Sequence, residues 1–471
     1  MHLSALSNLY HGGPDPEISG VTQDSRKVQP GWLFAAIPGT KVHGNDYIEA
    51  AVRQGASVIL AARGTKAAGV QVMESDNPRR DLALIAARFY QHQPKMVAAV
   101  TGTNGKTSTV HFAQQIWQSA GKMAVSLGTI GVQGAVNKPG SMTTPDAVAL
   151  HAALAEMSRA GVTHLAMEAS SHGLEQHRLD GVKIAAAGFT NLTHDHLDYH
   201  GTMDEYYRAK ARLFDLLSDD GVAVLNADVP EFEMLKARCG EKRVVSYGVA
   251  GRDLRMVSRA PVAGGQKVTL EIFGKRHDLL IPLVGSYMAM NALCAYGLAQ
   301  VDEPGVLEAL QGAPGRLQAV GGHPAGAAVY VDYAHTPDAL ARVLEALRPH
   351  TRGRLICIFG CGGDRDPVKR PIMGRIAAEG ADLAIITDDN PRSEKPEAIR
   401  ASIRAGAGPD ALEIGDRREA IANGVKQLKD GDVLVIAGKG HEQGQIFADH
   451  TDHFDDVEEA TNFIKHLAKA P

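Results

Sequence analysis

The chain has 471 residues, of which 44% are hydrophobic and 22% are charged, with a formal net charge of −5 at pH 7. This length predicts about three domains, because globular domains usually have roughly 150 residues. The slightly acidic balance argues against a dedicated nucleic-acid-binding protein, since such proteins are usually basic. No apolar run approaches the roughly 18 residues that cross a bilayer and the N-terminus does not open like a signal peptide, so we expect a cytoplasmic protein. The four cysteines lack paired C-x-x-C spacing, which predicts reduced and mostly buried thiols.

Residues 1–93 carry the signals of a small α/β domain. Strands are predicted over residues 31–37 and 56–60, with a helix over residues 47–52 between them. The polar loops beside the strand ends, such as residues 22–26, could bind an anionic ligand. Solvated turns explain the same loops, and the residues alone favour turns.

Residues 94–314 open with the pattern of a phosphate-binding loop. An apolar run at 96–100, the glycine-rich stretch 101–108 and apolar residues at helical spacing up to Ala120 predict a strand, a turn and a helix. Converging backbone N–H groups, the helix N-terminus and Lys106 would hold a polyphosphate, and Thr107 or Ser108 would turn a hydroxyl toward Mg²⁺. Val100 replaces the first glycine of the strict motif, so the loop is a variant. The alternative, an ordinary glycine-rich turn, is disfavoured by the flanking strand and helix.

Two later clusters in this segment indicate metal binding. Glu168 follows a predicted strand over residues 163–167, where a phosphate-loop protein needs a metal ligand, although it could also cap a helix. The metal-dependent hydrolase pattern H-x-H-x-D-H is nearly present in His194, His196, Asp198 and His200, but its last histidine is one place late and the groups would not converge. We therefore interpret His196 as a single Mg²⁺ ligand and keep the hydrolase as an alternative function.

Two further residues of the central segment have open interpretations. Lys210 lies on a predicted helix over residues 206–214, and composition alone would make it a solvated helix lysine. Asn291 is expected just before a helix that ends at Ala299. Its amide could face a nucleotide base or merely bond the backbone.

Residues 315–471 read as a second, Rossmann-like α/β domain. Strands are predicted over residues 329–333, 355–359, 384–387 and 433–437, and each is followed by a polar cluster at its carboxyl end, where open α/β sheets bind ligands. A zwitterion could be bound by Arg365 and Arg392 together with Asp389 and Glu442, because guanidinium groups bind carboxylates and acidic groups bind an ammonium. Salt bridges within the protein explain each pair taken alone equally well. The predicted fold class is thus α/β with three domains, the central one having a mostly parallel sheet.

Five motifs occur in the same order as in a known family. They are residues 101–107 (TGTNGKT), 168–173 (EASSHG), 190–200 (TNLTHDHLDYH), 332–335 (DYAH) and 438–442 (GKGHE). Together they resemble the ATP-dependent Mur ligases over nearly the whole chain. Residues 389–392 (DNPR) resemble the motif of members that add meso-2,6-diaminopimelate to UDP-N-acetylmuramoyl-L-alanyl-D-glutamate, whereas lysine-adding members lack the arginine. The lysine-adding ligase is the nearest alternative.

The resemblance implies a role for each matching residue. The implied ATP contacts are Gly102, Thr103, Asn104, Gly105, Lys106, Thr107, Ser108, Asn291, Arg316 and Asp332. The implied contacts to the UDP-linked dipeptide are Gln23, Ser25, Thr40, Lys41, Val42, Met142, Thr143, Thr144, Ser170, Gln176 and Arg178, where Met142 and Gln23 depart from the residue types usual in the family. The implied diaminopimelate contacts are Arg365, Asp389, Asn390, Pro391, Arg392, Gly438 and Glu442.

The resemblance also implies the chemistry. The catalytic residues would be Lys106, Glu168, His196 and Lys210, and the metal ligands Thr107, Glu168, His196 and Lys210, the last as a CO₂-derived carbamate (N6-carboxylysine). ATP would be the co-substrate, two Mg²⁺ ions would assist, and an acyl phosphate of the D-glutamyl γ-carboxylate would be attacked by the amine. The partners would be small-molecule substrates, with no nucleic acid or membrane span, and the protein would be a monomer.

Overall fold

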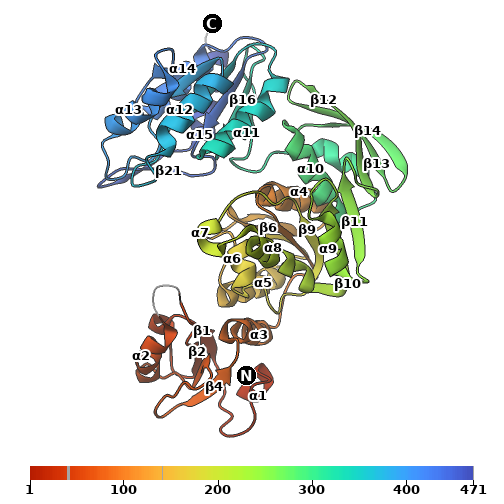
Figure 1. Cartoon of the computed structure of the whole chain (residues 1–471), viewed down its shortest axis with the longest axis vertical. Helices are drawn as coiled ribbons and strands as arrows, with labels where there is room; N and C mark the ends of the chain where they lie inside the picture. The colour runs from red at the N-terminus through yellow and green to blue at the C-terminus, as the bar shows by residue number, and fades with distance from the viewer. Residues whose placement is uncertain (40–42, 141, 470–471) are drawn as a thin grey trace. The chain divides into compact units, whose positions relative to one another are not determined.

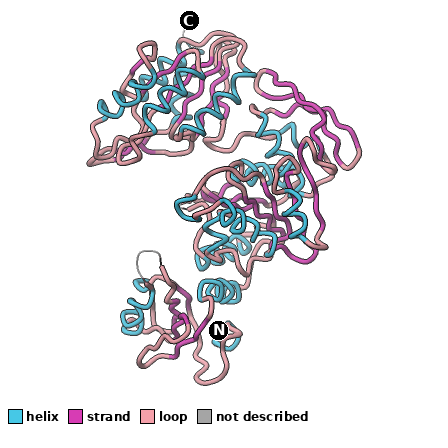
Figure 2. The backbone as a smooth tube through the Cα atoms, viewed as in Figure 1, coloured by secondary structure: helices cyan, strands magenta, loops and turns pink. Residues whose placement is uncertain are grey.

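The computed structural model describes residues 1–39, 43–140 and 142–469 (Figures 1 and 2). The chain divides into two compact units, one made of Met1–Tyr247 with Cys294–Val301 and the other of Gly248–Leu293 with Asp302–Pro471. Both units are mixed α/β with mostly parallel sheets, which confirms the predicted fold class.

The N-terminal part of the first unit is a four-stranded parallel sheet with the strands in chain order. Its strands are β1 (Gly20–Thr22), β2 (Trp32–Ala35), β3 (Val58–Ala62) and β4 (Gln71–Ser75), and its helices are α1 (Leu3–Leu6), α2 (Ile48–Arg53) and α3 (Pro78–Tyr90). Leu33 and Leu60 pack in one hydrophobic cluster, while their strand neighbours Phe34 and Ile59 pack in another. Both faces of the sheet are therefore buried around β2 and β3, which explains why these two strands are continuous apolar runs.

The larger sheet of the first unit has the strand order β11-β10-β9-β5-β8-β6-β7 and is parallel except for the β6 and β7 pair. Its strands are β5 (Met96–Thr101), β6 (Ala124–Gly128), β7 (Gly131–Gly134), β8 (His164–Glu168), β9 (Ile184–Phe189), β10 (Leu217–Asn226) and β11 (Arg243–Gly248). Its helices are α4 (Lys106–Ser119), α5 (Ala147–Arg159), α6 (Ser171–Glu175), α7 (Leu197–His200), α8 (Met203–Ala211) and α9 (Phe232–Cys239).

The strand order brings the polar motifs of this sheet together. β5 lies between β8 and β9, with Val100 opposite Glu168 and Thr101 opposite Phe189. Because the three strands are parallel, the loops that follow them meet at one edge of the sheet.

The turn from β5 into α4 has the predicted strand, turn and helix. Val97 to Val100 are fully buried in the sheet, and α4 buries Val110, Phe112 and Ile116 on the side that covers it. Helical spacing of these apolar side chains fixes which face of α4 meets the sheet.

The second unit contains a six-stranded sheet of order β15-β16-β20-β17-β18-β19, parallel except for β15. Its strands are β15 (Gln318–Val320), β16 (Ala328–Asp332), β17 (Leu355–Phe359), β18 (Leu383–Ile386), β19 (Leu412–Glu413) and β20 (Val433–Ala437). Its helices are α11 (Pro337–Leu347), α12 (Lys369–Gly380), α13 (Pro396–Ala407), α14 (Arg417–Lys426) and α15 (Asp456–Lys469), and a hairpin joins β21 (Gly444–Ile446) to β22 (Thr451–His453).

Two predictions for residues 94–314 are wrong. From residue 95 to about residue 314 the sequence pattern predicts alternating strands and helices. This alternation is interrupted by an antiparallel meander of β12 (Leu254–Val262), β13 (Gly265–Ile272) and β14 (Lys275–Ile281). In β13 the buried Val268, Leu270 and Ile272 recur at every second position, the pattern of a half-buried strand. Helix α10 (Ser286–Ala299) begins before Asn291, so this residue lies inside the helix and not ahead of it.

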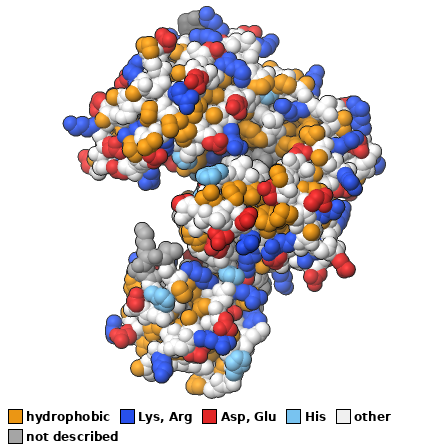
Figure 3. All heavy atoms as spheres, viewed as in Figure 1, with side chains coloured by type: hydrophobic (Ala, Val, Ile, Leu, Met, Phe, Trp, Pro, Cys, Tyr) orange, Lys and Arg blue, Asp and Glu red, His pale blue; other side chains and the backbone are white. Residues whose placement is uncertain are grey.

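The molecular surface agrees with the mixed composition. On the face shown in Figure 3, acidic and basic side chains are interspersed, and neither sign gathers into one large patch. All four cysteines are free and buried, as expected. Among the described residues, none of the helices combines the length and the apolar composition that crossing a bilayer requires.

Candidate active site

The glycine-rich loop after β5 depends on two unusual backbone conformations. Gly102 has φ +146° and Gly105 has φ +87°, both in the region that favours glycine. A Cβ at Gly102 would lie 1.9 Å from Oγ1 of Thr190. Only glycine therefore allows the loop to approach the end of β9 this closely.

The loop after β9 holds the glycine-rich loop in place. The backbone N–H of Thr103 donates to the carbonyl of Asn191 (2.9 Å), and the N–H of Asn104 donates to Oδ1 of Asn191 (3.0 Å). Thr190 Oγ1 donates to the carbonyl of Asn104 (2.6 Å). The phosphate-type loop is thus preorganised by the neighbouring strand end.

Two lysines converge on this loop. Nζ of Lys106 donates to the carbonyls of Gly102 and Thr103, both at 2.9 Å, and Nζ of Lys210 donates to the same Gly102 carbonyl at 2.8 Å. Lys210 is only 1% exposed, with its ammonium 4.3 Å from the ring centre of Tyr206. Burial lowers the pKa of Lys210 well below its usual value, and the Lys106 ammonium lowers it further. The composition-based picture of Lys210 as a solvated helix lysine is therefore wrong.

Glu168 ends β8 beside the first residues of α4. Its Oε1 accepts from Thr107 Oγ1 (3.0 Å) and from the N–H of Thr129 (2.8 Å), and the residue is 1% exposed. A buried carboxylate next to a hydroxyl provides the hard oxygen donors that Mg²⁺ prefers. Glu168, Thr107 and the two lysines thus occupy one region at the edge of the sheet.

The histidines in the loop after β9 are not arranged as ligands of one metal ion. His196 precedes α7 with φ +51°, and its ring lies 5.0 Å from that of His172. His200 is buried and hydrogen-bonded through Nε2 to Ser171 Oγ (2.9 Å). Within the described part of the chain, no three His, Cys, Asp or Glu residues are grouped so that they could hold a metal ion. The structure does not bring His196 into hydrogen-bond contact with Thr107 or Glu168 in the described ranges.

Six of the residues assigned to the dipeptide substrate form one network near Glu168. Arg178 donates through Nη2 to Gln176 Oε1 (2.7 Å) and through Nη1 to the carbonyl of Thr144 (2.7 Å), with Met142 Sδ at 3.9 Å. The network continues through hydrogen bonds from Thr144 Oγ1 to the carbonyl of Glu168, from the N–H of Ser170 to Thr144 Oγ1, and between the hydroxyls of Thr143 and Thr129.

Two further residues of that group, Gln23 and Ser25, follow β1 in the N-terminal part of the first unit. A cavity of about 500 Å³ is lined there by Gln23 and Ser25, and also by Asp24, Arg26, Tyr47 and Arg79, which the sequence did not single out as site residues. Asp24 accepts from the N–H and Nε of Arg26 at 3.1 and 2.9 Å, which orders this turn. The predicted residues Thr40, Lys41 and Val42 lie outside the described residues.

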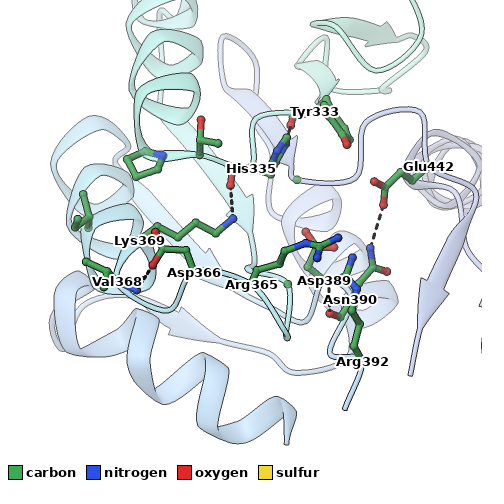
Figure 4. A pocket seen from close by; sticks show the side chains of 15 residues that line it. Tyr333, His335, Arg365, Asp366, Val368, Lys369, Asp389, Asn390, Arg392 and Glu442 are labelled. Atoms are coloured by element: carbon green, nitrogen blue, oxygen red, sulfur yellow. Dashed lines mark hydrogen bonds between the residues drawn. The ribbon is translucent and has the colours of Figure 1, made fainter. Parts of the chain in front are cut away.

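A second cavity, of about 550 Å³, opens at the carboxyl ends of the strands of the second unit (Figure 4). Its lining includes six of the seven residues assigned to diaminopimelate: Arg365, Asp389, Asn390, Arg392, Gly438 and Glu442. Pro391 is not among the lining residues; its carbonyl packs against Gly363, where a Cβ would approach to 1.9 Å. Among the predicted residues, two guanidinium groups and two carboxylates therefore line one cavity, and Asp366 and Lys369, which the sequence did not single out, line it as well.

Arg392 is oriented by backbone carbonyls. It has φ +53°, and its Nη1 donates to the carbonyls of Gly363 (2.9 Å) and Asn390 (3.4 Å). Arg365 contacts the carbonyl of Asp364 at 3.4 Å, and in Figure 4 its side chain points toward Asp389 and Asn390. Asn390 Nδ2 donates to Glu442 Oε2 at 3.0 Å.

The three predicted nucleotide contacts outside the glycine-rich loop belong to the second unit. Asp332 ends β16 and accepts from the N–H groups of Leu317 (2.7 Å) and Ala334 (2.9 Å). Burial raises the pKa of the Asp332 carboxyl, against the opposing effect of Arg316, whose guanidinium lies 4.9 Å from the Tyr333 ring centre. Asn291 is 5% exposed, and its Nδ2 is buried without a hydrogen-bond partner in the described structure.

Sequence comparison decides the family. The Mur ligase family catalytic domain matches residues 17–102, the Mur ligase middle domain matches residues 100–299, and the Mur ligase glutamate ligase domain matches residues 315–440. The chain belongs to the Mur ligase family. This Mur ligase is accordingly an ATP-dependent, amide-bond-forming enzyme.

Several relatives carry the same name. A Caulobacter vibrioides protein called UDP-N-acetylmuramoyl-L-alanyl-D-glutamate--2,6-diaminopimelate ligase is 54% identical to this Mur ligase over 98% of each chain. A Mesorhizobium japonicum protein of that name is 50% identical over 96% of each chain. A solved structure of a ligase with this name has a TM-score of 0.76 at 33% identity and covers 100% of both chains. The Thermotoga maritima MurF ligase in complex with ADP, at 18% identity, TM-score 0.61 and coverage of 95% and 98%, shares the fold.

Proposed function

We propose that this Mur ligase uses ATP to join meso-2,6-diaminopimelate to the D-glutamyl γ-carboxylate of UDP-N-acetylmuramoyl-L-alanyl-D-glutamate. The proposal is supported by the names of relatives that are 50% or more identical to the chain over nearly its whole length. In this proposal, the amino-acid specificity is determined by the cavity that Arg365, Arg392, Asp389 and Glu442 line. Its charges complement a zwitterion with an extra carboxylate, which lysine lacks.

We divide the chain, as the sequence predicts, into a substrate domain (1–93), an ATP-binding domain (94–314) and an amino-acid-binding domain (315–471). In this division the cavity lined by Gln23 and Ser25 takes part of the UDP-linked substrate, and the network around Arg178 takes the rest. The nucleotide binds the loop from Gly102 to Ser108, with Asn291, Arg316 and Asp332 as further contacts. The unsatisfied amide of Asn291 supports its assignment, because a base acceptor would give this buried donor a partner.

The carboxylate is activated by phosphorylation, since a carboxylate itself is a poor acylating group. The γ-carboxylate attacks the ATP γ-phosphate, ADP leaves, and the amine of diaminopimelate then attacks the acyl phosphate and releases phosphate. Lys106 stabilises the charge on the transferring phosphoryl group. Thr107 and Glu168 offer the oxygen donors that would hold Mg²⁺, which offsets phosphate charge when bound.

Lys210 and His196 complete the proposed catalytic set. The lowered pKa of Lys210 favours the neutral amine, which is the form that reacts with CO₂. Its carbamate would be an anion beside Lys106, able to ligate a second Mg²⁺, and this would relieve the repulsion of two adjacent cations. His196, half exposed at the start of α7, is placed in the metal-binding set on the family resemblance alone.

One experiment tests the function. ADP release is measured from the purified chain with ATP, Mg²⁺, the UDP-linked dipeptide and either diaminopimelate or lysine. We expect release that needs all substrates and prefers diaminopimelate. Greater release with lysine would identify the lysine-adding ligase, and equal release would contradict the proposed preference. Consumption of the UDP-linked dipeptide without ATP, measured by chromatography, would favour the hydrolase. We further propose that the enzyme acts as a monomer in the cytoplasm, in cell-wall synthesis, cell shape and division.

A further inference from the structure

A fully buried lysine lies directly behind the second cavity. Lys439 has no exposed side-chain surface and is not itself one of the cavity-lining residues, although its neighbour Gly438 is. It follows β20 between two glycines with positive φ, +120° at Gly438 and +56° at Gly440. A Cβ at Gly440 would lie 2.7 Å from Tyr333, so the loop can turn its lysine inward only because these positions lack side chains.

The ammonium of Lys439 connects three separate segments. Its Nζ donates to Asn390 Oδ1 (2.7 Å), in the loop after β18, and to the carbonyl of Gly444 (2.6 Å), at the start of β21. It also lies 3.8 Å from Asp389 Oδ1. The N–H of Ile446 donates to the same Asn390 oxygen at 3.0 Å.

These contacts fix the orientation of the Asn390 side chain. A lysine ammonium and a backbone N–H only donate, so the atom that they share must be the amide oxygen. The amide nitrogen then faces Glu442, to which it donates. A flipped amide would place two NH donors against the ammonium and the N–H, which is repulsive. One hydrogen of the Asn390 amide is used by Glu442, which leaves the second for an oxygen of a bound molecule.

The charge of Lys439 also has a specific partner. Asp389 is 6% exposed, and a buried carboxylate is costly without a nearby cation. Burial lowers the pKa of Lys439, while the Asp389 carboxylate acts in the opposite direction and favours the charged lysine. The ammonium of Lys439 therefore lies on the protein side of the Asp389 carboxylate, which also borders the cavity.

We propose that Lys439 is a positioning residue for amino-acid binding, which holds the Asn390 amide with its donor toward the ligand and the Asp389 carboxylate in place for an ammonium. This inference rests on the proposed function, in which the cavity binds the zwitterionic amine substrate. Lys439 touches no substrate itself and acts through Asn390 and Asp389.

The test compares Lys439→Met with Lys426→Met, a matched control at an exposed lysine in the last turn of α14. Steady-state ADP release gives KM for each substrate separately. We expect Lys439→Met to raise KM for the amine about tenfold or more, because a donor and a charge pair are lost. KM for ATP and for the UDP-linked dipeptide should change by less than about twofold, as they bind elsewhere. A rise of similar size for all three substrates, or none for the amine, would overturn the proposal.

A double-mutant cycle separates positioning from general damage. If Lys439 acts partly through Asn390, Lys439→Met should raise the amine KM by a clearly smaller factor when Asn390→Ala is already present than in the wild-type background, where the Asp389 and Asn390 routes are both intact. Fully additive effects would contradict this route.

A second variant covers the case in which Lys439→Met does not fold. Asn390→Asp keeps both contacts to the shared oxygen but replaces the donor nitrogen, so the amine KM should still rise about tenfold. An unchanged KM would overturn the proposal. Each variant is assayed with whichever amine the wild type uses, so that a wild type that prefers lysine contradicts the proposed function and still tests Lys439.

Discussion

Single residues with buried or adjacent charges mark both regions proposed to bind charged substrates. Lys106 and Lys210 share one backbone carbonyl, and Lys439 and Arg392 stand at the second cavity. Cations placed side by side repel each other, and a bound anion offsets this repulsion. Substrate phosphates and carboxylates, or a carbamate, would supply that anion, so these positions are where single substitutions should act on function more than on folding.

Arg392→Ala should weaken the use of diaminopimelate severely. Loss of the guanidinium removes the pairing partner of the distal carboxylate, and we expect kcat/KM for diaminopimelate to fall about a hundredfold or more. ATP affinity, measured by calorimetry, should be unchanged. Arg375→Ala is the control, because this arginine on α12 is 58% exposed beside Glu379. If the Arg392→Ala enzyme prefers diaminopimelate over lysine as strongly as the wild type does, Arg392 does not determine the choice of amino acid.

Lys210→Ala should lower the activity, and an added small carboxylate should restore part of it. If Lys210 works as a carbamate, its removal deletes an anion, and we expect kcat to fall about a hundredfold or more. High concentrations of a small carboxylate such as acetate should restore part of the rate. Lys236→Ala, at an exposed lysine of α9, controls for a salt effect on the wild-type rate. A fully active Lys210→Ala enzyme would contradict the proposed carbamate on Lys210.

At the scale of elements, the turn between β5 and α4 is fixed by its neighbours more than by its own hydrogen bonds. Thr190 and Asn191, which follow β9, contact Thr103 and Asn104 through both backbone and side chains. The phosphate loop is therefore as rigid as the edge of the sheet that carries it. Such preorganisation is what electrostatic stabilisation of a transferring phosphoryl group needs.

Gly102→Ala should disrupt this turn, whereas Gly121→Ala should be mild. Both glycines have positive φ, but a Cβ at Gly102 would meet Thr190 Oγ1 at 1.9 Å, and a Cβ at Gly121 has no atom within 4 Å. We expect Gly121→Ala to lower the free energy of unfolding by about 1 kcal/mol and to leave ATP affinity unchanged. Gly102→Ala should cost about 3 kcal/mol or more and abolish ATP binding. Urea unfolding and calorimetry measure both, and equal effects of the two variants would contradict the close-approach argument.

At the scale of the whole molecule, the proposed binding elements are divided between two compact units. The glycine-rich loop and Glu168 belong to the first unit, and the cavity with Arg365 and Arg392 belongs to the second. Each unit has its own sheet, and in each sheet the polar groups gather at the carboxyl ends of parallel strands. Diaminopimelate is therefore expected to stabilise the cavity region of the second unit, and the nucleotide is expected to stabilise the glycine-rich loop of the first.

Hydrogen exchange should map the two ligands to different units. A ligand present at a hundred times its Kd stabilises the state that binds it by about 2.7 kcal/mol, and exchange slows where opening is suppressed. We expect ADP with Mg²⁺ to protect residues 102–108, and diaminopimelate to protect residues 389–392 and 438–446. Protection of residues 102–108 by diaminopimelate alone, without any in the second unit, would contradict the assignment of the cavity.

The sequence by itself determined the family and the strands that end in polar motifs. It also picked out six of the residues that line the cavity of the second unit, but only Gln23 and Ser25 of those that line the other cavity. Apolar runs such as residues 97–100 and the glycine pattern after them are local signals, and local backbone preferences plus burial are enough to form a strand, a turn and a helix. It did not predict the meander of β12 to β14. There, buried apolar residues alternate in β13, at Val268, Leu270 and Ile272, but β12 and β14 are mostly exposed, so pairing between the strands decides the meander.

Only the tertiary structure decided which distant groups touch. Lys210 reaches the Gly102 carbonyl 108 positions away, and Lys439 reaches Asn390 across 49 positions. Composition made Lys210 a solvated helix lysine and gave Lys439 no role, because burial depends on which elements pack over a side chain. Strand order set those contacts: it places β5 between β8 and β9, and β20 between β16 and β17, and no local pattern encodes the neighbours of a strand.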